Sequence, residues 1–300
     1  MAGRDRASGR VSVAVYADAE ALASAVATAV AEEARRSVEV RGRFAVALAG
    51  GATPRRAYEL LAEPPLLGVV PWQGVQVFWT DERCVEESDP RSNERMAREA
   101  LVDRVPIPPD RIHPIRCGAD QEGKRGADAP GAEQVARRSA AEYDALLRRL
   151  FQGGDHTVSS GLLHHTGSAG RFHHAGSAGT ALDLALLGVG TDGHTASLFP
   201  DSEVIHERRR WAAPVFGHAV PGPGATAGGE GLWRVTLTVP FINMAASVLF
   251  VASGAEKASI VAEVLEGPPD ADRLPVRLIR PPTGTVRWFL DGSAATLLSK

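Results

Sequence analysis

The feature that most constrains the fold is the run at residues 182–187, apolar except for Asp183, which a glycine turn and then a polar motif follow. A run of this length suits a central strand of a parallel sheet that is covered on both faces. In open α/β sheets, ligands bind outside the carboxyl ends of such strands. The turn that carries Asp192 and His194 is therefore predicted to lie where this class of fold binds its ligands, with a helix beginning after His194.

Strand and helix patterns alternate along most of the chain. Strands are expected at residues 11–16, 44–49, 75–80, 112–114, 182–187, 211–215, 233–239, 247–252, 275–276 and 286–290, and helices at 19–36, 54–61, 93–102, 133–151, 240–245, 255–266 and 293–298. This alternation predicts an α/β fold with a mostly parallel sheet and helices on both faces. Residues 1–10 are expected to be a frayed tail, 11–16 an edge strand, and residues 1–300 a single domain.

Composition narrows the classes of function. A net charge of −3 gives no reason to expect a nucleic-acid partner, although residues 208–210 form a local basic patch. No apolar run approaches the roughly 20 residues that span a bilayer, and the N-terminus has no signal-like core, so a cytoplasmic protein without a membrane partner is expected. Cys84 and Cys117 are too few for a disulfide framework and are expected to be isolated buried thiols.

Residues 152–180 form a low-complexity stretch within this pattern. The stretch contains His156, His164, His165, His173 and His174, and HHTGSAG (164–170) recurs as HHAGSAG (173–179). A metal-binding tract is one interpretation. A disordered, solvated insertion is the favoured one, because glycine and serine give the stretch nothing to bury.

A glycine-rich turn joins the 44–49 strand to the next helix. Gly50 and Gly51 allow a ligand to approach the backbone, and Pro54 suits the first helical position, with Thr53 as the expected N-cap. A helix N-terminus of this kind attracts phosphate or another anion, but the turn matches no nucleotide-binding motif. The alternative is a tight turn with a purely structural cap.

The sequence Asp81-Glu82-Arg83 directly follows the 75–80 strand. Arg83 can grip a phosphate or a carboxylate through its planar guanidinium group, and either acidic neighbour can orient it. The alternative is a solvated corner held by salt bridges. Arg234, at the start of the 233–239 strand, and Lys257, one turn into the 255–266 helix, can add positive charge for the same ligand.

Asp192-Gly193-His194 is the sharpest chemical signal in the sequence. Histidine has the side chain whose unperturbed pKa lies nearest neutrality, which suits a general base, and Asp192 can hold its tautomer. Ser197 follows closely, but no GxSxG motif supports a serine hydrolase. No HExxH or paired-cysteine spacing supports a metal site.

Four segments together resemble one known family. They are AGGATPRRAYELL (49–61), FWTDERCVEESDPRSN (78–93), LLGVGTDGHTASLFPDS (186–202) and RVTLTVP with SGAEKA (between 234 and 258). In this order they resemble the glucosamine-6-phosphate isomerase/6-phosphogluconolactonase family, and within it the lactonases. The resemblance implies a modified Rossmann-like sheet and hydrolysis of 6-phospho-D-glucono-1,5-lactone in the oxidative pentose phosphate pathway.

The resemblance also implies roles for particular residues, and it implies a reaction that needs no cofactor or metal. His194 is the implied base, with Asp192 as its support. Substrate binding falls to Gly50, Gly51, Thr53, Arg83, Arg234 and Lys257. A monomer or a weak homodimer is expected.

Two alternatives to the lactonase remain. Amino-sugar-phosphate deaminases of this fold carry a glutamate shortly after the Gly-His pair, whereas residues 196–200 here hold no carboxylate. A non-enzymatic sugar-phosphate-binding protein is the second alternative. Regulators of that kind usually carry a helix-turn-helix, for which the residues before the first strand are too few.

Overall fold

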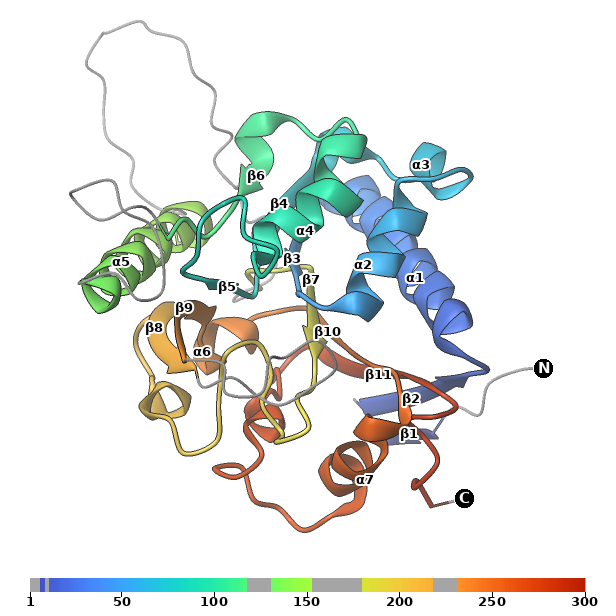
Figure 1. Cartoon of the computed structure of the whole chain (residues 1–300). Helices are drawn as coiled ribbons and strands as arrows, with labels where there is room; N and C mark the ends of the chain where they lie inside the picture. Colours follow the sequence, from blue (N-terminus) through green and yellow to red (C-terminus); the bar gives the residue numbers. More distant parts are fainter. Residues whose placement is uncertain (1–5, 9–10, 118–130, 153–179, 218–230, 300) are drawn as a thin grey trace, which may run out of the picture.

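The computed structural model of the chain describes residues 6–8, 11–117, 131–152, 180–217 and 231–299. Within this part of the chain, an eight-stranded sheet forms the centre of the molecule (Figure 1). In spatial order its strands are β1 (Arg6–Ser8), β2 (Val11–Tyr16), β11 (Thr285–Asp291), β10 (Ser247–Ala252), β7 (Leu184–Gly188), β3 (Phe44–Leu48), β4 (Val75–Trp79) and β6 (Ile112–His113). Every neighbouring pair is parallel except β1 with β2. The predicted mostly parallel sheet is therefore confirmed.

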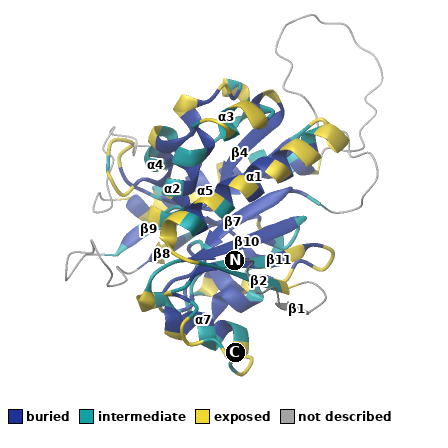
Figure 2. Ribbon diagram, turned by 90° about the vertical axis from the view of Figure 1, so that its right-hand side faces the viewer, coloured by how far each residue is buried: buried dark blue, intermediate teal, exposed yellow. Residues whose placement is uncertain are grey.

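Helices lie on both faces of this sheet, as predicted. They are α1 (Ala19–Arg41), α2 (Ala52–Leu61), α3 (Leu66–Val69), α4 (Asn93–Ala100), α5 (Ala132–Phe151), α6 (Val239–Ile242) and α7 (Ala258–Glu266). Figure 2 shows α1 over one face and α7 over the other, with the buried strands between them. Helix α1 runs five residues beyond its predicted end, because its C-cap is Gly42, with φ of 71°.

The strand order places a crevice at the carboxyl ends of β3 and β7. From β3 the chain passes to β4 and β6 on one side, and it then returns to β7, β10 and β11 on the other. The segments that follow β3 and β7 therefore diverge at this point, which is where open α/β sheets bind ligands.

A second, antiparallel sheet was not predicted. It consists of β5 (Asp81–Arg83), β9 (Leu232–Leu237) and β8 (Ala212–Gly217). The chain passes from one sheet to the other at Thr80, whose backbone N–H donates to Leu48 of β3 and whose carbonyl accepts from Leu237 of β9. The motif at residues 81–83 is thus a paired strand and not a solvated corner.

Several local predictions were wrong. Residues 6–8 form β1 beside β2, so β2 is not at the edge of the sheet. No helix begins after His194, where Ala196 adopts a left-handed φ of 48° and interrupts any helical run. Residues 275–278 form a 3-10 helix instead of a strand, and residues 293–298 form turns instead of a helix.

The two cysteines were also mispredicted, since Cys84 and Cys117 form a disulfide with Cα atoms 4.9 Å apart. The reason is topological. Strands β4 and β6 are parallel neighbours, so the segments beyond their carboxyl ends emerge at the same edge of the sheet and meet there.

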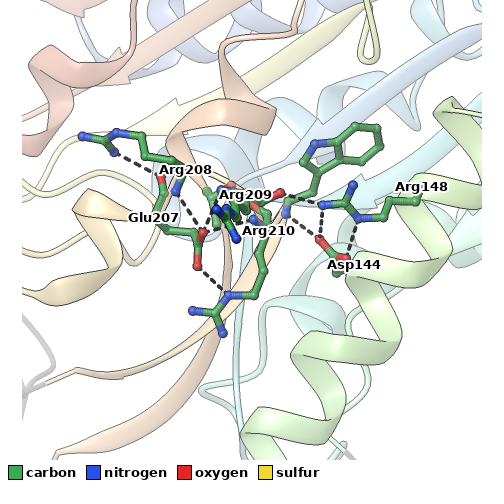
Figure 3. Close-up of polar contacts among 8 residues, drawn as sticks. Asp144, Arg148, Glu207, Arg208, Arg209 and Arg210 are labelled. Carbon is green, nitrogen blue, oxygen red and sulfur yellow. Dashed lines mark hydrogen bonds and ion pairs between the residues drawn. The ribbon is translucent and has the colours of Figure 1, made fainter.

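The basic patch at residues 208–210 has a structural role (Figure 3). One carboxylate oxygen of Glu207 accepts hydrogen bonds from the backbone N–H groups of all three arginines. Arg148 of α5 donates to the carbonyl of Arg209 and pairs with Asp144 at 2.7 Å. The turn therefore fastens the start of β8 to α5.

The histidine-rich stretch lies outside the described residues at 153–179, so its predicted disorder stays a prediction, as does the single-domain organisation. Among the described helices, none combines the length and the apolar character that crossing a membrane requires.

Candidate active site

A pocket of about 530 Å³ opens at the crevice between β3 and β7. Its lining comes from segments far apart in the sequence: residues 49–54 after β3, residues 80, 81, 83 and 93, residues 188–191, 194 and 196 after β7, residue 234 of β9, and residues 251–253, 256 and 257 after β10. Of the predicted site residues, those that line the pocket are Gly50, Gly51, Thr53, Arg83, His194, Arg234 and Lys257. Asp192 lies directly behind the lining, against His194.

Asp192 and His194 form a tight pair. Asp192 Oδ1 lies 2.6 Å from His194 Nδ1 and also accepts a hydrogen bond of 3.2 Å from the backbone N–H of His194. This contact places the ring proton on Nδ1 and leaves Nε2 as the nitrogen that can accept a proton from a bound molecule. The side chain of His194 is 20% exposed, so the ring is held yet reachable.

The turn around His194 is built for this pair. A Cβ atom on Gly190 would lie only 2.1 Å from His194 Nδ1, so only glycine leaves room for the ring. The Gly190 N–H donates to the carbonyl of His194, and the Thr195 hydroxyl donates to the carbonyl of Gly188 at the end of β7. Phe199 packs its ring 4.9 Å from the imidazole, centroid to centroid.

Asp192 is held in its ionised form. Burial alone raises the pKa of Asp192, but the hydrogen bond and the charge interaction with His194 outweigh burial and keep the pKa below its ordinary value. An ionised partner fixes the ring orientation and stabilises an imidazolium when His194 takes up a proton.

Two arginines of the second sheet also line the pocket. Arg83 of β5 and Arg234 of β9 are cross-strand partners, and both Nε atoms are buried without a hydrogen-bond partner. Burial lowers the pKa of Arg234, the charge of Arg83 lowers it further, and Asp81 and Glu82 oppose the shift. Half-buried guanidinium groups that make no ion pair are suited to a phosphate or carboxylate ligand.

Lys257 brings a third cation to the pocket. It ends the 3-10 helix Ala255–Lys257, which leads into α7. Burial lowers the pKa of Lys257, while the charges of Glu256 and Asp192 act in the opposite direction. Lys257 therefore lines the pocket within electrostatic reach of the Asp192–His194 pair.

The diglycine turn presents a helix N-terminus to the pocket. The N-cap of α2 is Gly51, with φ of 108°, and no side chain caps this end. The predicted Thr53 N-cap was therefore wrong, because the helix already begins at Ala52. Without a capping side chain, the first-turn N–H groups remain for a bound anion.

Other residues at the site were not predicted. Asn93 lines the pocket beside Arg83, and Phe199 packs under both His194 and Arg234. Asn93 ends one of the motif segments, but nothing local distinguishes it from an ordinary start of a helix. Among the residues that the structure describes, no cluster of three or more His, Cys, Asp or Glu side chains is suited to a metal ion.

Comparison with known proteins identifies consistent relatives. The family model for glucosamine-6-phosphate isomerases/6-phosphogluconolactonase matches residues 17–288. The 6-phosphogluconolactonase of Nostoc sp. is 36% identical over 266 residues, which is 88% of each chain. The 6-phosphogluconolactonase of Homo sapiens is 32% identical over 289 residues, covering 96% of this chain and 93% of that relative.

Solved structures agree with these matches. A 6-phosphogluconolactonase from Trypanosoma brucei superposes with a TM-score of 0.73 at 29% identity, over 96% of this chain and 98% of that one. A monomeric glucosamine-6-phosphate deaminase superposes with a TM-score of 0.67 at 19% identity, which shows likeness of fold alone.

Proposed function

The chain belongs to the glucosamine-6-phosphate isomerase/6-phosphogluconolactonase family, and we propose that it hydrolyses 6-phospho-D-glucono-1,5-lactone to 6-phospho-D-gluconate. The reaction consumes one water and opens the lactone ring, as in the oxidative pentose phosphate pathway. One observation carries the proposal. A single pocket holds an imidazole paired with an aspartate together with two half-buried arginines that make no ion pair within the described part of the chain.

His194 is the proposed general base. Its free Nε2 takes a proton from a water molecule, whose oxygen attacks C1 of the lactone. The ring oxygen then leaves and receives that proton back from the imidazolium, which ionised Asp192 stabilises. A lactone is an activated ester, so a positioned base that contributes about 10²–10⁴-fold, or about 3–5 kcal/mol, is a substantial share of the acceleration required.

The cations and the diglycine turn are the proposed substrate anchors. Arg83, Arg234 and Lys257 supply the positive charge that a phosphorylated sugar needs. Gly50, Gly51 and Thr53 add the open N-terminus of α2. The developing oxyanion needs a donor, which either Arg83 or a backbone N–H of a turn can provide. Fixing the phosphate end of the sugar holds C1 at the base and reduces the entropic cost of reaction.

Two parallel assays test the activity. Freshly prepared 6-phosphogluconolactone is followed by pH-stat or by coupled oxidation of the product, and glucosamine 6-phosphate is assayed for released ammonia. Hydrolysis well above the spontaneous rate, lost in His194→Ala, supports the proposal. Ammonia release without lactone hydrolysis would instead make the chain a deaminase, and binding without turnover a sugar-phosphate sensor.

The sequence between residues 196 and 200 favours hydrolysis over deamination. The first carboxylate after His194 is Asp201, whose side chain is exposed and whose backbone φ is 57°. An exposed side chain on a turn of this kind is not placed to act as a second acid in the pocket. The cytoplasmic location, the monomer or weak homodimer and the lack of nucleic-acid or membrane partners stay predictions.

A further inference from the structure

The side chain of Asn93 bridges an aspartate and the pocket arginine. Its Nδ2 donates to the carbonyl oxygen of Asp81 at 2.9 Å and to Asp81 Oδ1 at 3.2 Å. Its Oδ1 accepts a hydrogen bond of 2.9 Å from Arg83 Nη1. Asn93 is only 2% exposed, so both ends of its amide are committed and the amide has one orientation.

Asp81 is in turn fixed by the loop that carries His194. Asp81 Oδ2 accepts a hydrogen bond of 2.6 Å from the hydroxyl of Ser197, which is fully buried and lies three residues after His194. The backbone N–H of Ser197 donates to Thr236 of β9. A buried chain of hydrogen bonds therefore runs from the His194 loop through Asp81 and Asn93 to Arg83.

The position of Asn93 is further fixed by its surroundings. A Cβ atom on Gly50 would lie 2.0 Å from Asn93 Oδ1, so the amide lies directly against the diglycine turn. The backbone N–H groups of Asn93 and Glu94 donate to the carboxylate of Glu82, at 2.8 and 2.5 Å. The start of α4 and the end of β5 are thereby tied together at the pocket wall.

We propose that Asn93 is a positioning residue for Arg83, with its orientation set by Asp81 and Ser197. This assignment rests on the proposed function of the pocket. A neutral amide orients the guanidinium but leaves its charge intact. Asp81 reaches Arg83 only through that amide, and within the described residues Arg83 makes no ion pair of its own. The arginine is thus held in place while its full charge remains available to an anionic ligand.

The test compares substitutions at residue 93 by steady-state kinetics and by calorimetric binding of 6-phosphogluconate. Asn93→Ala should raise KM and Kd about tenfold, with a smaller effect on kcat. It removes one of the two hydrogen bonds that Arg83 Nη1 makes, the other going to the carbonyl of Arg91, and it does not touch His194. Asn93→Asp should weaken binding more than Asn93→Ala, because a carboxylate neutralises Arg83 and also faces Asp81. If Asn93 had a purely structural role, Asn93→Asp would not be expected to weaken binding more than Asn93→Ala.

The control variant is Asn243→Ala. Asn243 also commits its amide at both ends, donating to the carbonyl of Leu278 at 2.9 Å and accepting from the N–H of Arg280 at 2.7 Å, but it does not line the pocket. This variant should lose thermal stability and keep its KM and Kd. In an Arg83→Ala background, Asn93→Ala should have no further effect on either constant.

Two results would overturn the assignment while leaving the activity intact. One is an Asn93→Ala enzyme whose KM and Kd match those of wild type. The other is an Asn93→Ala substitution that raises KM and Kd by the same factor in the wild-type and the Arg83→Ala backgrounds. If Asn93→Ala does not fold, Ser197→Ala takes its place, and it should raise KM only when Arg83 is present.

Failure of the proposed function is recognised separately, as a wild-type protein that hydrolyses no lactone. In that case, crystal structures of the wild type and of Asn93→Ala test the role of Asn93 independently of activity. A displaced Arg83 guanidinium supports the assignment, and an unmoved one refutes it.

Discussion

Arg83 and Arg234 lie directly opposite one another in the antiparallel pairing of β5 with β9. Like charges in this position destabilise a sheet, and burial of both Nε atoms without partners adds to the cost. An anionic ligand at the two guanidinium groups would offset the repulsion between them. We therefore interpret the two arginines as residues that lower the stability of the ligand-free protein and increase its affinity for an anion.

Replacing Arg234 should separate stability from binding. We expect Arg234→Met to raise the free energy of unfolding of the ligand-free protein by roughly 0.5–1 kcal/mol, because the repulsion disappears. The same change should raise KM at least about tenfold. Thermal denaturation with and without 6-phosphogluconate measures both effects. Arg287→Met is the contrasting control, and it should destabilise the protein, since Arg287 pairs with buried Glu33. A destabilised Arg234→Met would contradict the interpretation.

The role proposed for His194 predicts a large change in kcat. His194→Ala should lower kcat at least about tenfold while leaving 6-phosphogluconate affinity nearly intact, because the imidazole acts in the transition state. Asp192→Asn should also lower kcat, since an amide can stabilise neither the tautomer nor the imidazolium. Near-normal turnover in a folded His194→Ala protein would remove this residue from the mechanism.

Lys257 is expected to act on binding. Lys257→Ala should chiefly raise KM, by about tenfold, because a phosphate contact is made equally in ground and transition states. Lys257→Arg, which keeps the charge, is the matched comparison and should recover part of the loss. If initial rates over a range of lactone concentrations give an unchanged KM, the phosphate is held elsewhere.

The disulfide should contribute measurably to stability. The bond between Cys84 and Cys117 has a sequence separation of 33, and a loop of that length is stabilised by about 3.7 kcal/mol on cross-linking. Urea denaturation with and without a reductant should show this difference. A Cys84→Ser/Cys117→Ser double variant should be indifferent to the reductant. Two freely titrating thiols in the native, untreated protein would show that the bond does not form.

The turn at Glu207 predicts a change of stability in acid (Figure 3). Burial alone raises the pKa of Glu207, but hydrogen bonds from the backbone N–H groups of Arg209 and Arg210 and the Arg210 side chain lower it to about 2. A carboxyl group whose pKa is lower in the folded state stabilises the protein fully above its ordinary pKa of 4.5. That stabilisation is lost as the pH falls from 4.5 toward 2.

Glu207→Gln should remove this contribution. We expect the variant to be about 1–2 kcal/mol less stable at pH 7, a modest figure because solvent screens a surface turn, and to differ less from wild type near pH 2. Denaturation midpoints measured across this range give the comparison. A difference that stays constant with pH would show that the carboxylate is not the cause.

Much of the fold and part of the site could be predicted from the sequence. The apolar run that became β7 and the glycine turn after it identified a buried strand and the segment that carries His194. These features are local, because the period of the apolar residues and the demands of a turn are set by neighbouring residues. The parallel α/β class followed from the alternation of such segments.

The rest was decided only when distant segments met. Nothing near Cys84 indicates Cys117, and no local pattern shows that Arg83 pairs with Arg234 across two strands or that the amide of Asn93 orients it. Their contacts depend on which strands are neighbours and on the crossing from the main sheet to the second sheet at Thr80. The sequence by itself determined the buried central strands and the glycine turns that follow them, whereas only the tertiary structure decided which charges face each other. Burial and turning are properties of short segments, but pairing depends on the spatial order of strands that lie far apart in the chain.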